Sequence, residues 1–368
     1  MLSRIKSQLK NFDWILLASV VLLLCFGLVE IYSVSLGRES ADFLNFQKQA
    51  YFAGAGLILL FVFSFIDSYF IKSLSRYLYF FGAFVLVAVL IFGQTVRGTK
   101  GWFIWGGFGF QPVELVKIIL IVFLANFFAA LATRVKTTRH FFASASGALF
   151  LIALVLFQPD FGSALILGSI WLTMVIAAGF PKKYFVIVGL SLLAVFVAAW
   201  LFFFQDYQKQ RIMTFLDPTA NSLESGYNIS QAIIAVGSGG LTGKGVGFGS
   251  QSQLKFLPEA QNDFIFAVIA EELGFLGVIL VLSFFFIFFF RCFRAIKRMN
   301  NDYSIYFVIG AASLIFIQMF INIGMNIGIM PVVGLPLPFV SYGGSSLLSL
   351  LILVGMVENI VIKAKTSY

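Results

Sequence analysis

Residues 256–274 have the sequence FLPEAQNDFIFAVIAEELG, in which a polar turn runs directly into an apolar helix. They close the one long segment, 206–274, whose many polar residues and glycines a bilayer would not accept. Glu259 and Asp263 stand four residues apart, so two carboxylates lie at the mouth of the predicted helix. We therefore expect the other helices to hold this segment in position.

Around this segment the composition is that of an integral membrane protein. Of the 368 residues, 60% are hydrophobic and 11% are charged, whereas soluble domains carry about 25% charged residues. A membrane helix needs roughly 20 apolar residues. Ten such runs lie near 14–34, 49–66, 78–94, 113–132, 143–158, 162–180, 184–204, 265–290, 304–329 and 341–362. The sequence predicts an all-α integral membrane protein of about ten transmembrane helices, with 1–368 forming a single polytopic domain.

The distribution of lysine and arginine predicts the orientation. With a cytoplasmic N-terminus, sixteen of the 25 Lys and Arg residues fall in cytoplasmic segments and eight in external ones, as the positive-inside rule requires. The net charge of +9 could suggest a protein that binds nucleic acid, but this distribution argues against it. Both termini are therefore predicted to be cytoplasmic. The long loop 205–263, between the seventh and eighth helices, is predicted to be extracytoplasmic.

Further charged residues lie at the external ends of predicted helices. Glu114 and Lys117 are three residues apart in the first turns of the helix that Pro112 begins, so they share one face. Ionisable groups at this depth usually face a bundle interior or a wet cavity; a self-contained packing pair is the alternative. Asp160, in the short turn QPDFGS (158–163), either caps the next helix or faces the same cavity.

A glycine-rich run, GSGGLTGKGVGFGS at 237–250, lies within the long loop. It fails the P-loop pattern, because Ser238 stands at the first required glycine and Gly245 follows Lys244. Glycines still allow the backbone to approach a ligand closely, so ligand binding and a flexible surface loop both remain open. The preceding residues 226–237 have the apolar periodicity of a short helix.

Asp263 begins a stripe of small residues, which lets another helix approach closely. On a helix the stripe stays on one face and continues through Ala267, Ala270 and Gly274. Glu271 and Glu272 would be costly deep in a bilayer. We therefore expect 262–272 near the outer interface and the span proper from about Gly274. By spacing alone, an N-cap is a more common role for Asp263 than catalysis.

The last external loop, 322–346, contains no charged residue. Pro331, Pro336 and Pro338 prevent a regular helix through its middle. Non-helical backbone near a membrane must be buried in protein or line a cavity. The loop is therefore predicted to form a groove wall suited to an apolar chain.

Four stretches together carry a family resemblance: FQPVELVK (110–117), QPDFG (158–162), the segment 211–274, and 325–346. The chain resembles, from end to end, the SEDS (shape, elongation, division, sporulation) proteins, the RodA/FtsW group of bacterial peptidoglycan glycosyltransferases. The resemblance implies a multi-pass protein of the cytoplasmic membrane that polymerises lipid II at the outer face. It also implies a class B penicillin-binding protein as partner. The motif LPLPFV (335–340) and the short cytoplasmic tails look more like RodA than FtsW.

The resemblance implies that Asp263 is the essential aspartate and that Glu114 and Lys117 match a functional carboxylate–lysine pair. Glycosyl transfer from a lipid diphosphate needs a base for the acceptor hydroxyl and positive charge near the leaving group. Glu259 is expected to support the base. The cations Lys117, Arg211 and Lys244 are the candidates for contact with the diphosphate. The full set of expected substrate-binding residues is Glu114, Lys117, Asp160, Arg211, Lys244 and Glu259. A divalent cation, Mg²⁺ or Mn²⁺, is compatible with this chemistry, although no ligand cluster in the sequence predicts one.

Two other classes of function remain alternatives, besides the division-specific FtsW-like role. A lipid II flippase or transporter would also have many helices with internal acids, but its acids should gather near the midplane and its halves should repeat. A scaffold that only recruits the penicillin-binding protein would need neither Asp263 nor Lys117. Zinc chemistry is not expected, because the chain has one histidine and its two cysteines are predicted at opposite depths.

Overall fold

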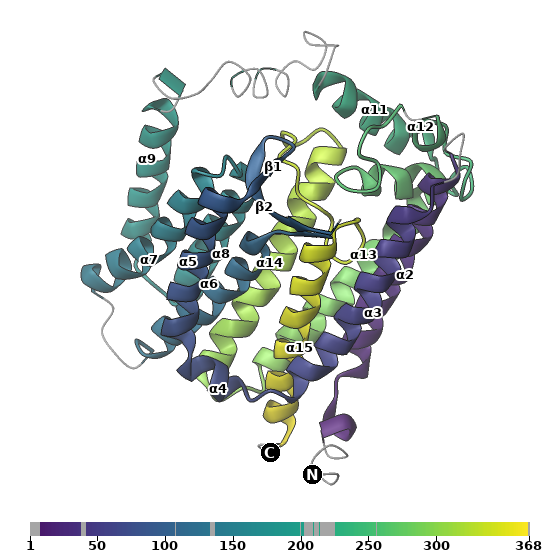
Figure 1. Ribbon diagram of the computed structural model, residues 1–368. Coiled ribbons are helices and arrows are strands. Elements are labelled where there is room, and N and C mark those ends of the chain that lie inside the picture. Colours follow the sequence, from purple (N-terminus) through teal and green to yellow (C-terminus); the bar gives the residue numbers. More distant parts are fainter. Residues whose placement is uncertain are drawn as a thin grey trace.

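The computed structural model describes residues 8–37, 42–106, 108–132, 137–198, 200–201, 225–254 and 256–366, together with 209 and 213. It is a bundle of long helices (Figure 1). The helices are α2 Trp14–Leu36, α3 Leu44–Phe65, α4 Ser68–Ser73, α5 Ser75–Phe92, α6 Pro112–Ala129, α7 Thr138–Leu156, α8 Phe161–Ala177, α9 Lys182–Ala198, α11 Ser225–Ser238, α12 Ser250–Gln253, α13 Ile265–Ile296, α14 Asp302–Asn326 and α15 Gly344–Thr366. The strands are β1 Gln94–Val96, β2 Thr99–Trp105 and β3 Phe108–Phe110.

Each of the ten predicted apolar runs coincides with one of these helices. Within the described residues, eight helices are long and apolar enough to cross a membrane, by length and composition. Helix α8 is apolar but has 17 residues. The prediction of a helical, multi-pass membrane protein is confirmed, while the count of ten spans stays a prediction.

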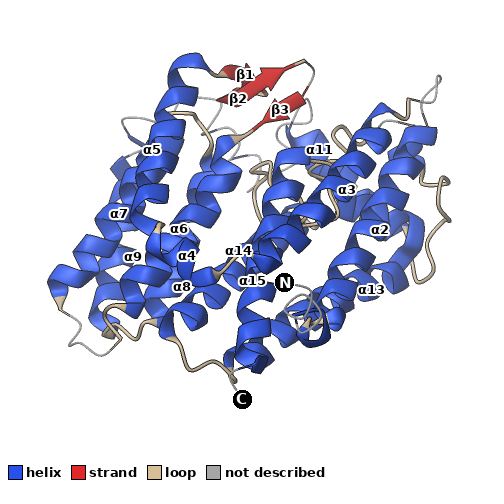
Figure 2. Ribbon diagram, turned by 60° about the horizontal axis from the view of Figure 1, so that its bottom comes forward, coloured by secondary structure: helices blue, strands red, loops and turns tan. Residues whose placement is uncertain are grey.

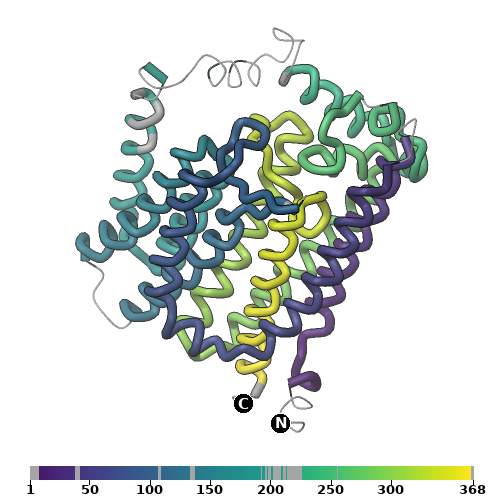
Figure 3. The backbone as a smooth tube through the Cα atoms, in the orientation of Figure 1, coloured from purple at the N-terminus to yellow at the C-terminus, as the bar shows by residue number. Residues whose placement is uncertain are grey.

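The two ends of the bundle differ in character. The start of α2 and the end of α15 lie together at one end, and the strands, α11 and α12 lie at the other (Figures 1 and 3). Helix α11 occupies the place where a short helix was predicted at 226–237. The arrangement agrees with termini on one side of the membrane and the long loop on the other.

Helix α15 is buried over most of its length and packs most extensively against α3. Glycines bring these two helices together: a Cβ on Gly355 would lie 2.4 Å from the Leu60 carbonyl oxygen. Similarly, a Cβ on Gly56 would lie 2.3 Å from the Leu351 side chain. This small-residue contact is the close helix approach typical of membrane bundles. Helix α15 therefore lies in the interior of the bundle, where it also contacts α14, α6 and α4.

A three-stranded antiparallel sheet, β1-β2-β3, covers the end opposite the termini (Figure 2). The all-α prediction missed it, because strands of 3, 7 and 3 residues are too short to show a clear period. Arg97 and Gly98 form the two-residue turn between β1 and β2, both with positive φ (51° and 80°). That conformation suits the twist of a tight hairpin. The turn projects Arg97 from the sheet.

Helix α13 is interrupted at Gly274, which has φ 65° and ψ −162°. The glycine-rich loop compensates the break, because the amides of Phe275 and Leu276 donate to the carbonyls of Gly240 and Leu241 at 3.0 and 3.1 Å. Residues 265–273 are thus a separate helical segment that precedes the long run 275–296. The expected start of the span near Gly274 agrees with this break.

Candidate active site

Asp263 lies in the turn 257–264, immediately before α13, and is partly buried. The N-cap position of α13 is Phe264, and no side chain caps the helix there. The main-chain carbonyl of Asp263, rather than its carboxylate, is held: it accepts hydrogen bonds from Nδ2 of Asn322 and Asn326 of α14, at 3.0 and 2.9 Å. Capping, the alternative role for Asp263, is therefore not what its carboxylate does.

The turn is held on two further sides. Gln261 accepts from Asn45 of α3 at 2.8 Å and donates to Ser35 of α2 at 3.2 Å. In the uncharged loop, Ser341 donates to the Asn262 carbonyl at 2.5 Å, and the Tyr342 amide donates to the Gln261 carbonyl at 2.8 Å. A side chain held through its backbone in this way is preorganised. Within the described residues, the Asp263 carboxylate itself has no hydrogen-bond partner.

The environment of Asp263 raises its basicity. Burial raises the pKa of its carboxyl to about 6, the positive charge of Arg97 opposes this rise, and the negative charge of Glu259 adds to it. A general base works best when its pKa lies near the working pH. Perturbed carboxyls of this kind are typical of functional sites.

Glu259 is paired with Arg97. Arg97 Nη2 lies 2.5 Å from Glu259 Oε2, and the side chain of Asn262 donates to the same oxygen. Arg97 comes from the hairpin turn and was not among the sequence-predicted site residues. The sequence could have pointed to Arg97 only through its position in a hairpin turn, and that turn is recognisable only once the short strands on either side are predicted.

The uncharged loop forms one wall of this site. Gly334, with φ 71°, faces the carboxylate: a Cβ on it would lie 3.6 Å from Asp263 Oδ2. Leu335, Leu337 and Phe339 are buried, as expected for non-helical backbone in a membrane protein. The loop therefore packs into the bundle on one side and borders Asp263 on the other.

Glu114 and Lys117 form a buried ion pair on α6. Lys117 Nζ lies 2.7 Å from Glu114 Oε1, with 0% of the lysine side chain and 6% of the glutamate side chain exposed. The structure thus shows the self-contained pair that was the alternative from the sequence, and a contact of the pair with substrate stays a prediction. Both side chains lie in the bundle interior near the outer end of α6.

Asp160 is the N-cap of α8: its Oδ1 accepts from the Ser163 amide at 2.9 Å. Its other oxygen accepts from Nε2 of Gln111, the residue that precedes α6, at 3.3 Å. The capping role is therefore present in the structure. It also ties the external end of α8 to the segment that carries Glu114.

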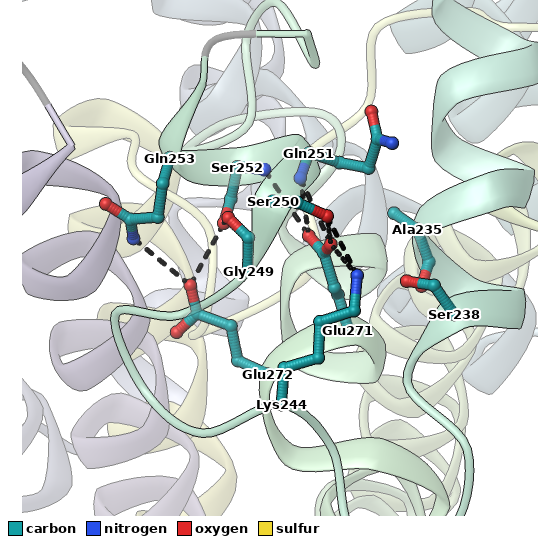
Figure 4. Close-up of polar contacts among 10 residues, drawn as sticks. All are labelled: Ala235, Ser238, Lys244, Gly249, Ser250, Gln251, Ser252, Gln253, Glu271 and Glu272. Atoms are coloured by element: carbon teal, nitrogen blue, oxygen red, sulfur yellow. Dashed lines mark hydrogen bonds and ion pairs between the residues drawn. The ribbon is translucent and has the colours of Figure 1, made fainter.

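Lys244 lies in a different cluster, together with the adjacent Glu271 and Glu272 (Figure 4). Lys244 Nζ is 2.8 Å from Glu271 Oε1 and 2.8 Å from Ser250 Oγ. Glu271 also accepts from the amides of Gln251 and Ser252. The structure thus gives Lys244 a structural partner, and its predicted contact with a diphosphate stays a prediction.

Glu272 is equally well partnered, by Ser33 Oγ at 2.5 Å, the Gly247 amide at 3.0 Å and Ser252 Oγ at 3.0 Å. Both glutamates are fully buried, and these hydrogen bonds offset the cost of burying them. The amides of Lys244 and Gly245 donate to the main-chain carbonyls of Glu271 and Glu272. The Gly247 amide donates to the Glu272 carboxylate. In this structure the glycine-rich loop forms a clasp around the break in α13, and its predicted binding of a ligand stays a prediction.

Arg211 lies outside the described residues. No three His, Cys, Asp or Glu side chains come together as a metal-binding group within the part of the chain that the structure describes. The sequence-predicted residues therefore fall into four places: Asp263 with Glu259, the Glu114–Lys117 pair, Asp160 at the α8 N-terminus, and Lys244 in the clasp.

Comparison with known proteins agrees with this architecture. The FtsW/RodA/SpoVE family model, described as "Cell cycle protein", matches residues 13–366. Stage V sporulation protein E of Bacillus subtilis is 37% identical over 357 residues, covering 95% of this chain and 96% of that protein. Peptidoglycan glycosyltransferase MrdB of Escherichia coli K12 is 36% identical over 357 residues, covering 95% and 93%.

A similar solved structure is reported as "Structural coordination of polymerization and crosslinking by a peptidoglycan synthase complex". Its matching chain superposes with a TM-score of 0.80 at 29% identity, covering 97% of this chain and 98% of the other. Sequence and fold agree over nearly the whole length. The chain belongs to the FtsW/RodA/SpoVE family.

Proposed function

We propose that this protein is a peptidoglycan glycosyltransferase that polymerises lipid II at the outer face of the bacterial cytoplasmic membrane. The observation that carries the proposal is the state of Asp263. Its carboxylate does not cap the helix, its carbonyl is held by Asn322 and Asn326, and its pKa is raised to about 6. These are the properties of a general base rather than of a structural carboxylate.

In the proposed reaction, an acceptor hydroxyl of one glycan attacks the anomeric carbon of a lipid-diphosphate donor. Asp263 takes the hydroxyl proton, the new C–O bond forms, and the bond to the diphosphate breaks with its electron pair leaving on the phosphate oxygen. Glu259 and Arg97 set the charge around the base, because both act electrostatically on Asp263. The Glu114–Lys117 pair, Asp160, Arg211 and Lys244 remain proposed substrate contacts.

A divalent cation, Mg²⁺ or Mn²⁺, would find one unengaged carboxylate here, since Glu259 is paired with Arg97. Most of its ligands would therefore come from the donor phosphates and water, as Mg²⁺ commonly prefers. When bound, it would neutralise charge on the departing diphosphate.

The choice between subtypes rests on sequence motifs. The LPLPFV stretch at 335–340 and the short tails favour an elongation role like that of RodA, while the similarity to sporulation and elongation relatives is nearly equal. We propose a class B penicillin-binding protein as the partner, supported by the likeness to one chain of a peptidoglycan synthase complex. Complementation of rod shape, but not of division or sporulation, in depleted cells would support the elongation role.

The test of the activity uses purified protein and lipid II in detergent, with glycan polymer separated on a gel. Asp263→Asn should fold normally, because the hydrogen bonds of Asp263 use its carbonyl. Its rate should fall by about 10²–10⁴-fold, the usual effect of losing a general base. Asp302→Asn, which alters an exposed acid in the first turn of α14, serves as the control and should be unaffected.

Near-normal polymerisation by Asp263→Asn would remove Asp263 as the base. Translocation of lipid II by the wild-type protein without polymer would indicate a flippase instead. Neither activity, in the presence of the penicillin-binding protein, would indicate a scaffold.

A further inference from the structure

At the end of the bundle that carries the termini, a shallow surface cleft opens between the C-terminal ends of α13 and α15, beside the start of α2. Four cations line it, Arg291, Arg294, Arg298 and Lys365, with a single carboxylate, Asp13. The cleft lies at the opposite end of α13 from the Asp263 turn. The proposed glycosyl transfer uses none of its residues.

One side of the cleft is fixed by an ion pair. Arg291 donates from Nε at 2.9 Å and from Nη2 at 2.5 Å to Oδ2 of Asp13. Asp13 is itself buried, and its Oδ1 caps α2 by accepting from the Leu16 amide at 3.2 Å. Behind it, Glu358 of α15 accepts from the Asp13 amide at 3.2 Å. These hydrogen bonds therefore join α2, α13 and α15 on this side of the cleft.

Two further arginines of the cleft have no carboxylate partner among the described residues. Arg294 lies one turn after Arg291 on α13, and Arg298 lies in the turn that follows the helix. Both are exposed, and neither has an ion pair with any described carboxylate. Lys365 donates to the Asn11 carbonyl at 3.0 Å and lies 4.0 Å from Asp13, whose charge Arg291 already shares. The cleft keeps an excess of positive charge.

Arginine side chains bind phosphate oxygens with two donors at once. The distribution of Lys and Arg places this end of the bundle at the cytoplasmic leaflet, whose surface carries anionic phospholipids. Isolated arginines at helix ends simply extend toward headgroups. Here the Arg291–Asp13 ion pair, Arg294 of the last turn of α13, Arg298 of the turn after it and Lys365 of α15 line one cleft.

We propose that this cleft is a binding site for the phosphate of an anionic phospholipid of the inner leaflet. Bound there, the headgroup bridges the ends of α13 and α15 and adds to the ion pair that anchors α2. The ligand chemistry is a phosphate anion, which the membrane supplies as a phosphodiester headgroup.

The test is native mass spectrometry of the purified full chain, titrated with dioleoylphosphatidylglycerol and separately with dioleoylphosphatidylcholine. The variant R294Q/R298Q removes the unpaired arginines and leaves the Arg291–Asp13 pair intact. The control R76Q/K182Q removes two exposed charges from the same predicted side, outside the cleft. Thermal unfolding of both variants in detergent without added lipid checks that each is folded, and R294K/R298K checks that charge at these positions suffices for partial binding.

Wild type and R76Q/K182Q should retain phosphatidylglycerol in preference to phosphatidylcholine. The R294Q/R298Q variant should bind phosphatidylglycerol roughly 25-fold more weakly, about fivefold for each arginine. Equal weakening in R294Q/R298Q and R76Q/K182Q would overturn the site, because it would show general attraction to an anionic lipid. Saturable binding of inorganic phosphate that displaces phosphatidylglycerol would overturn the assignment to a lipid.

Discussion

Arg97 and Glu259, which are 162 positions apart in the chain, meet in an ion pair of 2.5 Å at the edge of the candidate active site. Both residues have a left-handed backbone, with φ of 51° and 55°. Their side chains are 59% and 42% exposed, and ion pairs this exposed contribute little to stability. Their importance lies in the opposite effects of the two charges on Asp263.

The rate of polymerisation should depend on the protonation of Asp263. Since the base must be ionised and its pKa is about 6, the rate should fall as the pH drops through about 6. Arg97 lowers this pKa, so Arg97→Gln should raise it and move the acidic limb of the pH–rate profile to higher pH. Glu259 raises it, so Glu259→Gln should move the limb to lower pH and leave partial activity.

Lys100→Gln is the control for these profiles, because it removes a cation from the same hairpin that has no ion pair with a described acid. An unchanged pH profile in Arg97→Gln would contradict the electrostatic role of the pair. A loss of rate at every pH would indicate that Arg97 contacts the substrate directly.

The Glu114–Lys117 pair should show the behaviour of a buried ion pair. Lys117→Met leaves the Glu114 carboxylate buried without its partner, which typically costs about 3–5 kcal/mol. The double variant Glu114→Gln with Lys117→Met should recover much of this stability, measured by thermal unfolding in detergent. If the pair only packs, the double variant should also recover polymerisation; we expect it to stay inactive, since the pair is a proposed substrate contact.

The clasp around α13 should depend on the backbone of Gly274. Its φ is 65°, and a Cβ there would lie 2.3 Å from the Gly243 amide nitrogen. Gly274→Ala should therefore destabilise the protein by more than about 2 kcal/mol and lower its unfolding temperature. Gly54→Ala, in α3 with no atom near the new Cβ, should leave that temperature unchanged or slightly raised. Equal unfolding temperatures for the two variants would show that the clasp tolerates strain at Gly274.

The predicted orientation can be tested by cysteine labelling in cells with a permeable wall. Ser252, although it lies in the external loop, is a poor position because it is buried and donates to Glu272. Leu241 is 72% exposed in the same loop, so Leu241→Cys should react with an impermeant thiol reagent. Thr137→Cys, at the opposite end of the bundle, should not. Labelling of Thr137→Cys alone would reverse the orientation.

The sequence by itself determined the helices and the position of the turn with Asp263. Apolar runs of about 20 residues can satisfy their backbone in a bilayer only as helices, and within the described residues each of the ten predicted runs contains a helix. The start of the span near Gly274 was also predictable, because Glu271 and Glu272 are too costly deep in a bilayer. Likewise, the i,i+3 spacing of Glu114 and Lys117 placed them within reach of each other.

Tertiary structure alone decided which charges meet. Spacing along the chain could not reveal that Arg97 reaches Glu259, because the hairpin that presents Arg97 has strands too short for a periodic signal. It also could not choose between a cap and a free carboxylate for Asp263, since that depends on the two α14 asparagines that hold the turn by its carbonyl. Spacing also could not reveal the role of the glycine-rich loop. Its amides donate hydrogen bonds to Glu271 and Glu272, which only the folded chain brings next to it.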